Sequence, residues 1–327
     1  MKLLLEISME CESLARAEAL SAASALDGSP VVLHEDTGIV VVDTSADPKV
    51  LASRLGLCHF VSEWLDSCLP QDLEARASTI DVPGPIRVRS TKVGEIAMDL
   101  AAVSRRVGAI VGESRGVDLH SPASDIRLVF SNRVHVGRVV AAIDRTSFEE
   151  RKNRYMPFIY PASLHPKFAR ALVNLTQVPN GQTLLDPFCG TGAIVAEAAM
   201  IGLNARGTDI AERMIEGAGR NLAHLGLEAD LRKCDVGDIA HATKGVRGIA
   251  TDPPYGRSTS TDGEEIPVLY RRAFAAFADV LSRKDRVAIV VPDPALLSGA
   301  DDFKILDKHE LRVHRSLTRY FCVLERH

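Results

Sequence analysis

The second half of the chain, from about Pro166, alternates short apolar segments with longer amphipathic ones. The pattern is clearest in TLLDPFCGTGAIVAEAAMIGLNARGTDIAERMIEGAGRNLAHLG, and it continues through VRGIATD, VLYRRAFAAFADVL and RVAIVVPD. Short apolar runs suit strands and the amphipathic stretches suit helices. Regular alternation of the two predicts a doubly wound, mainly parallel sheet. We therefore expect an α/β protein with a Rossmann-like domain over residues 166–327, closed by an antiparallel hairpin in the tail.

The first half predicts two smaller α/β domains. Residues 1–65 contain the strand KLLLEISM, the helix SLARAEALSAASAL and the hairpin PVVLHEDTGIVVVD, and we predict a second helix from about Val50 to Leu65. The Asp36-Thr37-Gly38 turn joins two β-branched strands, as hairpins do. This order of elements favours a ferredoxin-like domain.

Residues 66–146 form the second predicted domain, which has a basic face. The strand IRVRST precedes a helix whose apolar positions Ile96, Leu100, Val103, Val107 and Ile110 repeat every three or four residues. That spacing buries one helix face and leaves Arg105 and Arg106 on its rim. The hairpin DIRLVFSNRVHVGRVVAAI follows, and we expect the charged, proline-bounded residues 147–165 to be a linker.

The composition excludes several classes of protein. No run approaches the roughly 20 apolar residues of a membrane span, and the apolar start is interrupted at Glu6, so we expect a cytoplasmic protein. The 6 cysteines contain no C-x-x-C pair, so neither a metal site nor a disulfide framework is expected. A formal net charge of -4 gives no overall attraction to nucleic acid or membrane. Our default expectation is a monomer.

The glycine loop DPFCGTGA follows the first strand of the Rossmann-like domain. Gly190 and Gly192 allow a ligand to approach the backbone, and Asp186 ends the strand. A dinucleotide fingerprint needs Gly or Ala where this chain has Val195, so pyrophosphate binding is disfavoured. Asp209 ends the second strand, where an acid can accept from two ribose hydroxyls.

The third candidate strand ends in KCDVGD, where Asp235 or Asp238 could accept from an adenine amine. Each feature alone has an ordinary interpretation, since a G-x-G loop is often only a turn and a strand-end Asp is usually a solvated cap. Their conjunction, without a phosphate cradle, indicates S-adenosylmethionine, a cationic, ribose-bearing and phosphate-free cofactor.

The tetrapeptide DPPY, Asp252 to Tyr255, ends the fourth strand. An exocyclic base amine is a poor nucleophile because its lone pair is delocalised into the ring. Asp252 and the carbonyl of Pro253 can each accept one amine N–H, and the stiff Pro253-Pro254 pair keeps them aimed. Tyr255 can stack on a base taken out of its helix. The motif therefore predicts catalysis of amine methylation at these four residues.

The run LLDPFCGTGAIVAEA, GTDIAERMIEGAGRNL, TDPPYGRS, LYRRAF and HRSLTRYF resembles the THUMP-containing tRNA guanosine N2-methyltransferases, above all the archaeal enzymes acting at position 10. The resemblance implies a THUMP RNA-binding domain at residues 66–146, a tRNA partner and N2-methyl- and N2,N2-dimethylguanosine as products. It implies cofactor contacts at Asp186, Phe188, Gly190, Gly192, Asp209, Ile210, Asp235 and Val236. The segment PFIYPASLHPKFAR departs from the family's usual Pro-rich segment, which leaves the partner of the methionine carboxylate unassigned.

Arginines in the second domain and near the DPPY loop are candidates to contact RNA phosphates, which position a nucleic acid without reading its bases. Basic residues on strands are more often simply solvated, so the THUMP resemblance rather than the charge supports this prediction. The candidates are Arg87, Arg89, Arg105, Arg106, Arg127, Arg133, Arg138, Arg257, Arg312, Arg315 and Arg319.

Two alternatives stay open at this point. An adenine amine in DNA or another RNA would be methylated by the same chemistry, although enzymes of that kind more often carry Asn at the first position of the tetrapeptide. A non-catalytic RNA-binding protein could use the cofactor only to stabilise its fold. The intact Asp252 and Tyr255 disfavour that second alternative.

Overall fold

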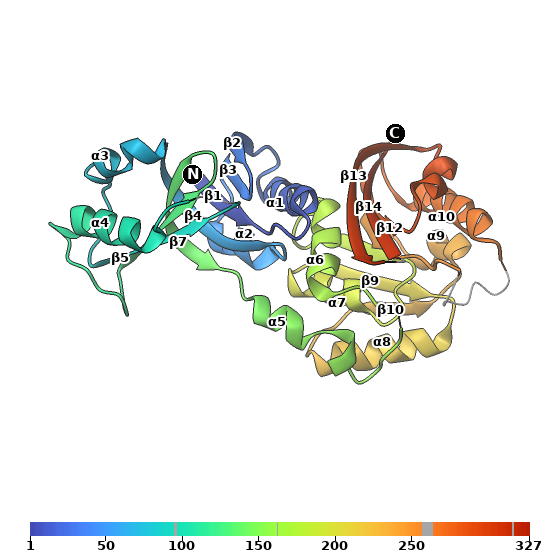
Figure 1. The fold of residues 1–327 in the computed structure, drawn as a ribbon. Helices are drawn as coiled ribbons and strands as arrows, with labels where there is room; N and C mark the ends of the chain where they lie inside the picture. Colours follow the sequence, from blue (N-terminus) through green and yellow to red (C-terminus); the bar gives the residue numbers. More distant parts are fainter. Residues whose placement is uncertain (95–96, 162, 257–263, 316) are drawn as a thin grey trace. The chain divides into compact units, whose positions relative to one another are not determined.

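The computed structural model describes all of the chain except residues 95–96, 162, 257–263 and 316 (Figure 1). The chain forms two compact units. The N-terminal unit comprises Met1–Glu12, Asp27–Ser53 and Cys58–Ile143. The C-terminal unit comprises Ser13–Leu26, Arg54–Leu57 and Asp144–His327.

A seven-stranded sheet in the order β2-β3-β1-β4-β7-β6-β5 organises the N-terminal unit. Strand β4 pairs antiparallel with β7, from Phe60 opposite Ala142 to Cys68 opposite Val134, so the strands of both expected small domains lie in one sheet. The strands are β1 (Lys2–Ile7), β2 (Val31–Asp36), β3 (Ile39–Asp43), β4 (Cys58–Cys68), β5 (Ile86–Lys92), β6 (Ser124–Phe130) and β7 (Val134–Ala142). The helices are α2 (Pro48–Arg54), α3 (Leu73–Ala77) and α4 (Leu100–Gly112).

The helix predicted from about Val50 to Leu65 is confirmed only as far as Arg54. Helix α2 ends at Arg54, and β4 begins at Cys58. Gly56 interrupts the helical pattern, and the β-branched and aromatic residues of CHFVSEW favour a strand that also finds two partners in the sheet. The segment therefore supplies the strand that joins the two halves of the sheet.

Helix α4 has the amphipathic form that the sequence predicted. Asp99 caps it by accepting a hydrogen bond from the backbone N of Ala102. Val103, Val107 and Val111 are buried on one face, whereas Arg105 and Arg106 are exposed. Ile96, which was predicted to belong to this helix, lies outside the described residues.

A second seven-stranded sheet, in the order β10-β9-β8-β11-β12-β14-β13, organises the C-terminal unit. The first five strands in this order, β10, β9, β8, β11 and β12, are parallel to one another. Strand β14 pairs antiparallel with β12 and with β13, and it forms the predicted hairpin with β13. The strands are β8 (Thr183–Asp186), β9 (Asn204–Asp209), β10 (Asp230–Lys233), β11 (Val246–Thr251), β12 (Arg286–Val291), β13 (Phe303–His314) and β14 (Leu317–Arg326). The helices are α1 (Glu12–Asp27), α5 (Arg145–Glu150), α6 (Pro166–Leu175), α7 (Ala193–Met200), α8 (Glu212–His224), α9 (Ile239–Ala242) and α10 (Ile266–Val280).

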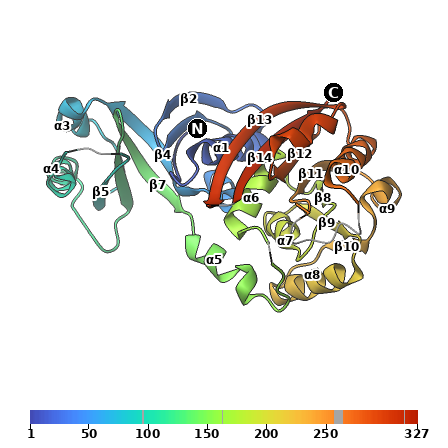
Figure 2. The same ribbon diagram turned by 45° about the vertical axis from the view of Figure 1, so that its right-hand side comes forward.

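Helices cover both faces of this second sheet (Figure 2). On one face, Phe274 and Phe277 of α10 pack in a cluster with Leu185, Ile249 and Ile289 of the central strands. Because side chains alternate along a strand, the residues between them point to the opposite face, which α6 contacts through β11 and β12. The central strands are therefore buried on both sides, which agrees with their uninterrupted apolar sequences.

Strand β8 lies between β9 and β11, although β11 follows β10 in the chain. The strand order thus reverses beside β8, and ligands of open α/β sheets bind at the carboxyl ends of the strands at such a point. Asp186, Asp209 and Thr251 are the last residues of β8, β9 and β11. Within the described ranges, no helix is long and apolar enough to cross a membrane, and no group of His, Cys, Asp and Glu could hold a metal ion.

Candidate active site

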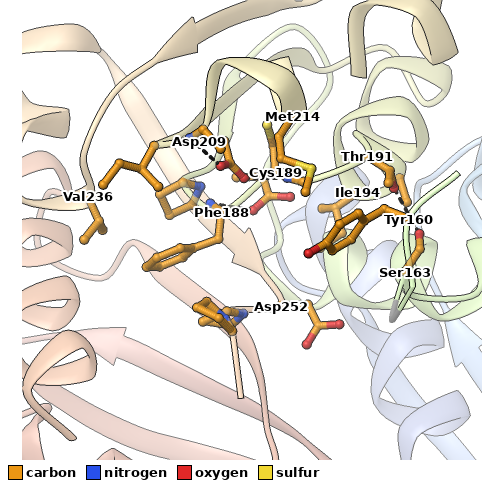
Figure 3. A pocket seen from close by; sticks show the side chains of 18 of the residues that line it. Tyr160, Ser163, Phe188, Cys189, Thr191, Ile194, Asp209, Met214, Val236 and Asp252 are labelled. Atoms are coloured by element: carbon orange, nitrogen blue, oxygen red, sulfur yellow. Dashed lines mark hydrogen bonds between the residues drawn. The ribbon is translucent and has the colours of Figure 1, made fainter. Parts of the chain in front are cut away.

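A cavity of about 240 Å³ lies at the carboxyl ends of the parallel strands in the C-terminal unit (Figure 3). In the figure, Asp209 and Asp252 border it from opposite sides. Of the predicted cofactor residues, all but Gly192 line it: Asp186, Phe188, Gly190, Asp209, Ile210, Asp235 and Val236. All four residues of the DPPY motif line it as well. The structure therefore brings nearly the whole predicted site together.

Asp186 is the deepest carboxyl of the site, with 1% of its surface exposed. Its Oδ1 accepts hydrogen bonds from the backbone N of Phe188, at 3.2 Å, and from the hydroxyl of Thr251, at 2.7 Å. Burial raises the pKa of Asp186 to about 7, although both hydrogen bonds act in the opposite direction. The side chain thus fixes the glycine loop to the end of β11.

Asp209 orders the other side of the glycine loop. Its Oδ2 accepts from the backbone N of Gly190 at 3.0 Å, and its Oδ1 accepts from Ala211 N at 3.0 Å. Burial raises its pKa above the ordinary value. Gly192 has φ +82° and lies so close to α8 that an added Cβ would be 3.0 Å from the Cβ of Ala218. Gly192 thus permits helix packing and does not contact the cavity, which corrects its predicted role.

Asp235, and not its alternative Asp238, lines the cavity. Its Oδ1 accepts from Gly237 N at 2.8 Å and from the guanidinium of Arg272 on α10. Burial alone would raise the pKa of Asp235, but these hydrogen bonds outweigh it and hold the pKa below its usual value. Arg272 also donates to Glu264 Oε2 at 2.7 Å. No role was predicted for Arg272 from the sequence, and its only signal was its place in the LYRRAF run.

The two carboxylate oxygens of Asp252 have different partners. Oδ1 accepts a 2.5 Å hydrogen bond from the hydroxyl of Tyr255, and Oδ2 lies 3.7 Å from Nη2 of Arg319. Burial raises the pKa of Asp252 to about 6, against the opposing effects of Arg319 and Tyr255. Burial and the neighbouring Asp252 raise the pKa of Tyr255, which stays a neutral donor.

The sequence did not predict the contribution of residues 153–161 and 163–165, which we call the strap. Tyr160 and Ser163 of the strap line the cavity, and Ser163 Oγ lies 3.1 Å from Thr191 Oγ1 of the glycine loop (Figure 3). Phe158 anchors the strap, because its backbone N donates to Asn221 Oδ1 at 2.8 Å and its ring packs against Gly217. The only earlier signal was that this segment, PFIYPASLHPKFAR, departs from the family pattern.

The charge of the cavity restricts its ligand. Among its described lining residues, Arg272 is the only basic one, and two carboxylates already hold it. The acids at the strand ends can accept from hydroxyls and amines, whereas a phosphate would meet a cavity of the same charge. The residues therefore fit a cationic, ribose-bearing ligand such as S-adenosylmethionine.

Arg127 does not lie on an exposed rim as the sequence predicted. It is buried, and its Nη2 donates to Oε2 of the equally buried Glu6 at 2.7 Å. Side chains alternate along β6, so Arg127 lies on the same face as the buried Val129, and the carboxylate of Glu6 compensates its charge there. We remove Arg127 from the candidate RNA contacts.

Several of the other arginines that were predicted to contact RNA already interact with protein groups. Arg87 and Arg89 both pair with Asp125, Arg138 pairs with Glu63, and Arg133 donates to the carbonyl of Ser67. Arg105, Arg106, Arg312 and Arg315 are exposed, and Arg106 pairs with Glu74. Arg319 is buried beside Asp252, so its predicted RNA-facing position was wrong. Arg257 lies outside the described residues.

Five parallel strands extended by an antiparallel hairpin, with acids placed for a nucleoside at their carboxyl edge, define a Rossmann-like methyltransferase. A family model described as UPF0020, the RMKL-like methyltransferase domain, matches residues 153–320, and the chain belongs to this family.

Curated relatives align with most or all of the chain. The chain is 36% identical over 338 residues, covering 100% of both chains, to the tRNA (guanine(10)-N2)-dimethyltransferase of Methanothermobacter thermautotrophicus. It is 36% identical over 256 residues, 75% of each chain, to the enzyme of the same name from Pyrococcus abyssi. The crystal structure of TrmN from Thermus thermophilus shares the fold over 100% of both chains, with a TM-score of 0.57 and 23% identity.

Proposed function

We propose that this protein methylates the exocyclic N2 amine of a guanosine in tRNA, with S-adenosylmethionine as the methyl donor. The observation that carries the proposal is the position of Asp252, an acceptor whose side chain is only 13% exposed, at the wall of the cavity in a methyltransferase fold. Two relatives are named for guanine(10)-N2 dimethylation, and we extend that position and a dimethylated product to this chain.

The residues present fit the proposed cofactor. Asp209 would accept from the ribose hydroxyls, Asp235 from the adenine amine, and Phe188, Ile210 and Val236 would enclose the adenine ring. When bound, the cofactor supplies an electrophilic methyl group on a sulfonium and departs as a neutral thioether. The carboxylate of Asp252 provides negative charge that favours a cation in this cavity.

The base amine would bind to the acceptors of the DPPY loop. Asp252 Oδ1 accepts from Tyr255 and can accept a second hydrogen, so the amine binds at this oxygen and the Tyr255 hydroxyl can then leave it. The freed phenol ring can then stack on the extruded guanine. Asp252 and the carbonyl of Pro253 hold the two amine hydrogens, so the nitrogen lone pair points toward the methyl group. The excess proton leaves the nitrogen after transfer.

The exposed Arg105, Arg312 and Arg315 are the main proposed phosphate contacts, and Arg106 is exposed as well but pairs with Glu74. Such contacts position an RNA and make its binding sensitive to salt. Arg87, Arg89, Arg133 and Arg138 would have to exchange a protein partner for a phosphate. We propose the four of them as secondary contacts.

The test is transfer of radiolabelled methyl from S-adenosylmethionine to unmodified tRNA transcripts, followed by nucleoside analysis and mapping. We expect N2-methylguanosine and N2,N2-dimethylguanosine at position 10. Label in methyladenosine would show that the acceptor is adenosine and not guanosine. Label at another guanosine would show that position 10 is not the site of methylation.

Asp252→Ala should lower the rate of methyl transfer at least about 100-fold, because it removes an acceptor that acts on the reacting amine. Cofactor affinity, measured by calorimetry, should change little. The matched control is Asp293→Asn, because Asp293 also follows a strand and precedes a proline but does not line the cavity. Full activity of Asp252→Ala would refute the mechanism.

A further inference from the structure

Arg319, which was predicted from the sequence to contact RNA, lies beside the DPPY motif instead. It is on β14, paired with Leu311 of β13, and only 9% of its side chain is exposed. Its Nη2 lies 3.7 Å from Oδ2 of Asp252, the proposed amine acceptor. An arginine in this buried position has a structural cost, since a guanidinium loses its hydration there.

The surroundings of Asp252 explain why a cation is needed. Tyr255 from the same loop donates to Oδ1, and Tyr270 of α10 and Asp186 of β8 are the other titratable groups that interact with this carboxylate. Within the described residues, Arg319 is the cation that pairs with Asp252. Tyr255 and Tyr270 are neutral, and Asp186 disfavours a second negative charge, so a single guanidinium opposes the loss of hydration.

We propose that Arg319 is a positioning residue that keeps Asp252 ionised and directs its two oxygens to different tasks during methylation. Oδ2 faces the guanidinium, which leaves Oδ1 as the oxygen that exchanges the Tyr255 hydroxyl for the base amine. A protonated Asp252 would carry a hydrogen where the amine needs an acceptor. The inference rests on the proposed function, because it assigns Asp252 the role of amine acceptor.

The distance between the guanidinium of Arg319 and the carboxylate of Asp252 suits this role. At 3.7 Å the guanidinium is close enough to stabilise the carboxylate electrostatically, but it does not form a short hydrogen bond to Oδ2. Arg272 and Asp235, elsewhere in the cavity, are in direct hydrogen-bond contact. Oδ2 of Asp252 is therefore not occupied by its arginine, whereas Oδ1 of Asp235 is.

The test is the pH profile of kcat/KM for tRNA methylation between pH 5 and pH 9, with saturating S-adenosylmethionine. The acid limb of the wild-type profile should lie near pH 6, where Asp252 takes up a proton. In Arg319→Met, removal of the cation should raise the acid limb by at least about one pH unit, so the loss is at least about fivefold at pH 6, approaches tenfold toward pH 5, and is small at pH 9. Arg319→Lys should shift the limb less, because it keeps the charge.

Arg326→Gln is the matched control. Arg326 is on the same strand, and it donates to Asp302 at 2.9 Å and does not line the cavity. Arg326→Gln should therefore leave the acid limb of the pH profile unchanged. If Arg319→Met folds poorly, the smaller shift in Arg319→Lys decides the question.

An equal loss of activity at every pH in the Arg319 variants, or an unchanged profile, would overturn the inference and indicate a structural role. Failure of the proposed function is a different result, because the wild-type protein would then transfer no methyl to tRNA. Cofactor affinity should be measured over the same pH range. A pH dependence of that affinity reports on Asp186 and Asp209 at the cofactor site, so it can be separated from the effect of Asp252 on methyl transfer.

Discussion

Asp186 should make the apo protein less stable as the pH rises, and Asp186→Asn should remove that effect. The carboxyl is buried, and its pKa is raised from the model-compound value of 3.8 to about 7. A group whose pKa is higher in the folded state stabilises the fold fully below its unfolded pKa, and this contribution is lost as the pH rises through its folded pKa. The relevant window is therefore pH 4 to 7.

The size of the effect follows from the change in proton affinity. At about 1.4 kcal/mol for each tenfold change, a rise of the pKa from 3.8 to about 7 corresponds to about 4 kcal/mol. Asn resembles the protonated acid in shape and is neutral at every pH. Asp186→Asn should thus resemble the wild type near pH 4 and be more stable at pH 8 by as much as about 4 kcal/mol.

The assay is urea unfolding of the apo protein at half-unit steps from pH 4 to pH 8.5. Glu18 also has a pKa raised to about 7 by burial, so the difference between variant and wild type, and not the wild-type slope, measures Asp186. Asp238→Asn is the control, because Asp238 is exposed and its charge is hydrated in both states. A difference that does not change with pH, or a variant less stable than wild type at pH 8, would refute the reasoning.

The remaining predictions concern packing and a buried ion pair. Gly217→Ala should destabilise the C-terminal unit by about 1–3 kcal/mol and weaken S-adenosylmethionine binding, because the new Cβ would lie 2.1 Å from the Phe158 ring that anchors the strap. Thermal unfolding and calorimetry measure the two effects, and unchanged values in both would contradict the assigned contact. Arg127→Met should cost about 3–5 kcal/mol, because Glu6 is then buried without its partner. The double variant with Glu6→Gln should recover most of that loss in urea unfolding, and no recovery would contradict the pairing.

Local sequence patterns were sufficient for the elements of the C-terminal unit. Strand-length apolar runs, the glycine loop and the acids at strand ends are features of a few neighbouring residues, and parallel strands bring their carboxyl ends together whatever the rest of the chain does. This is why Asp186, Asp209, Asp235 and Asp252 could be assigned to one cavity before the fold was seen. The helix predicted over β4 failed because apolar spacing there suited both structures, and the pairing with β1 and β7 decided between them.

The sequence by itself determined the fold class of the C-terminal unit and the chemistry of its site, because both depend on short-range periodicity and on residues that end strands. Only the tertiary structure decided what the arginines do. Arg127 meets Glu6, Arg272 meets Asp235, and Arg319 meets Asp252 across long separations in the chain. Whether a guanidinium faces water, RNA or a carboxylate depends on the residue that folding places opposite it, and no local pattern encodes that partner.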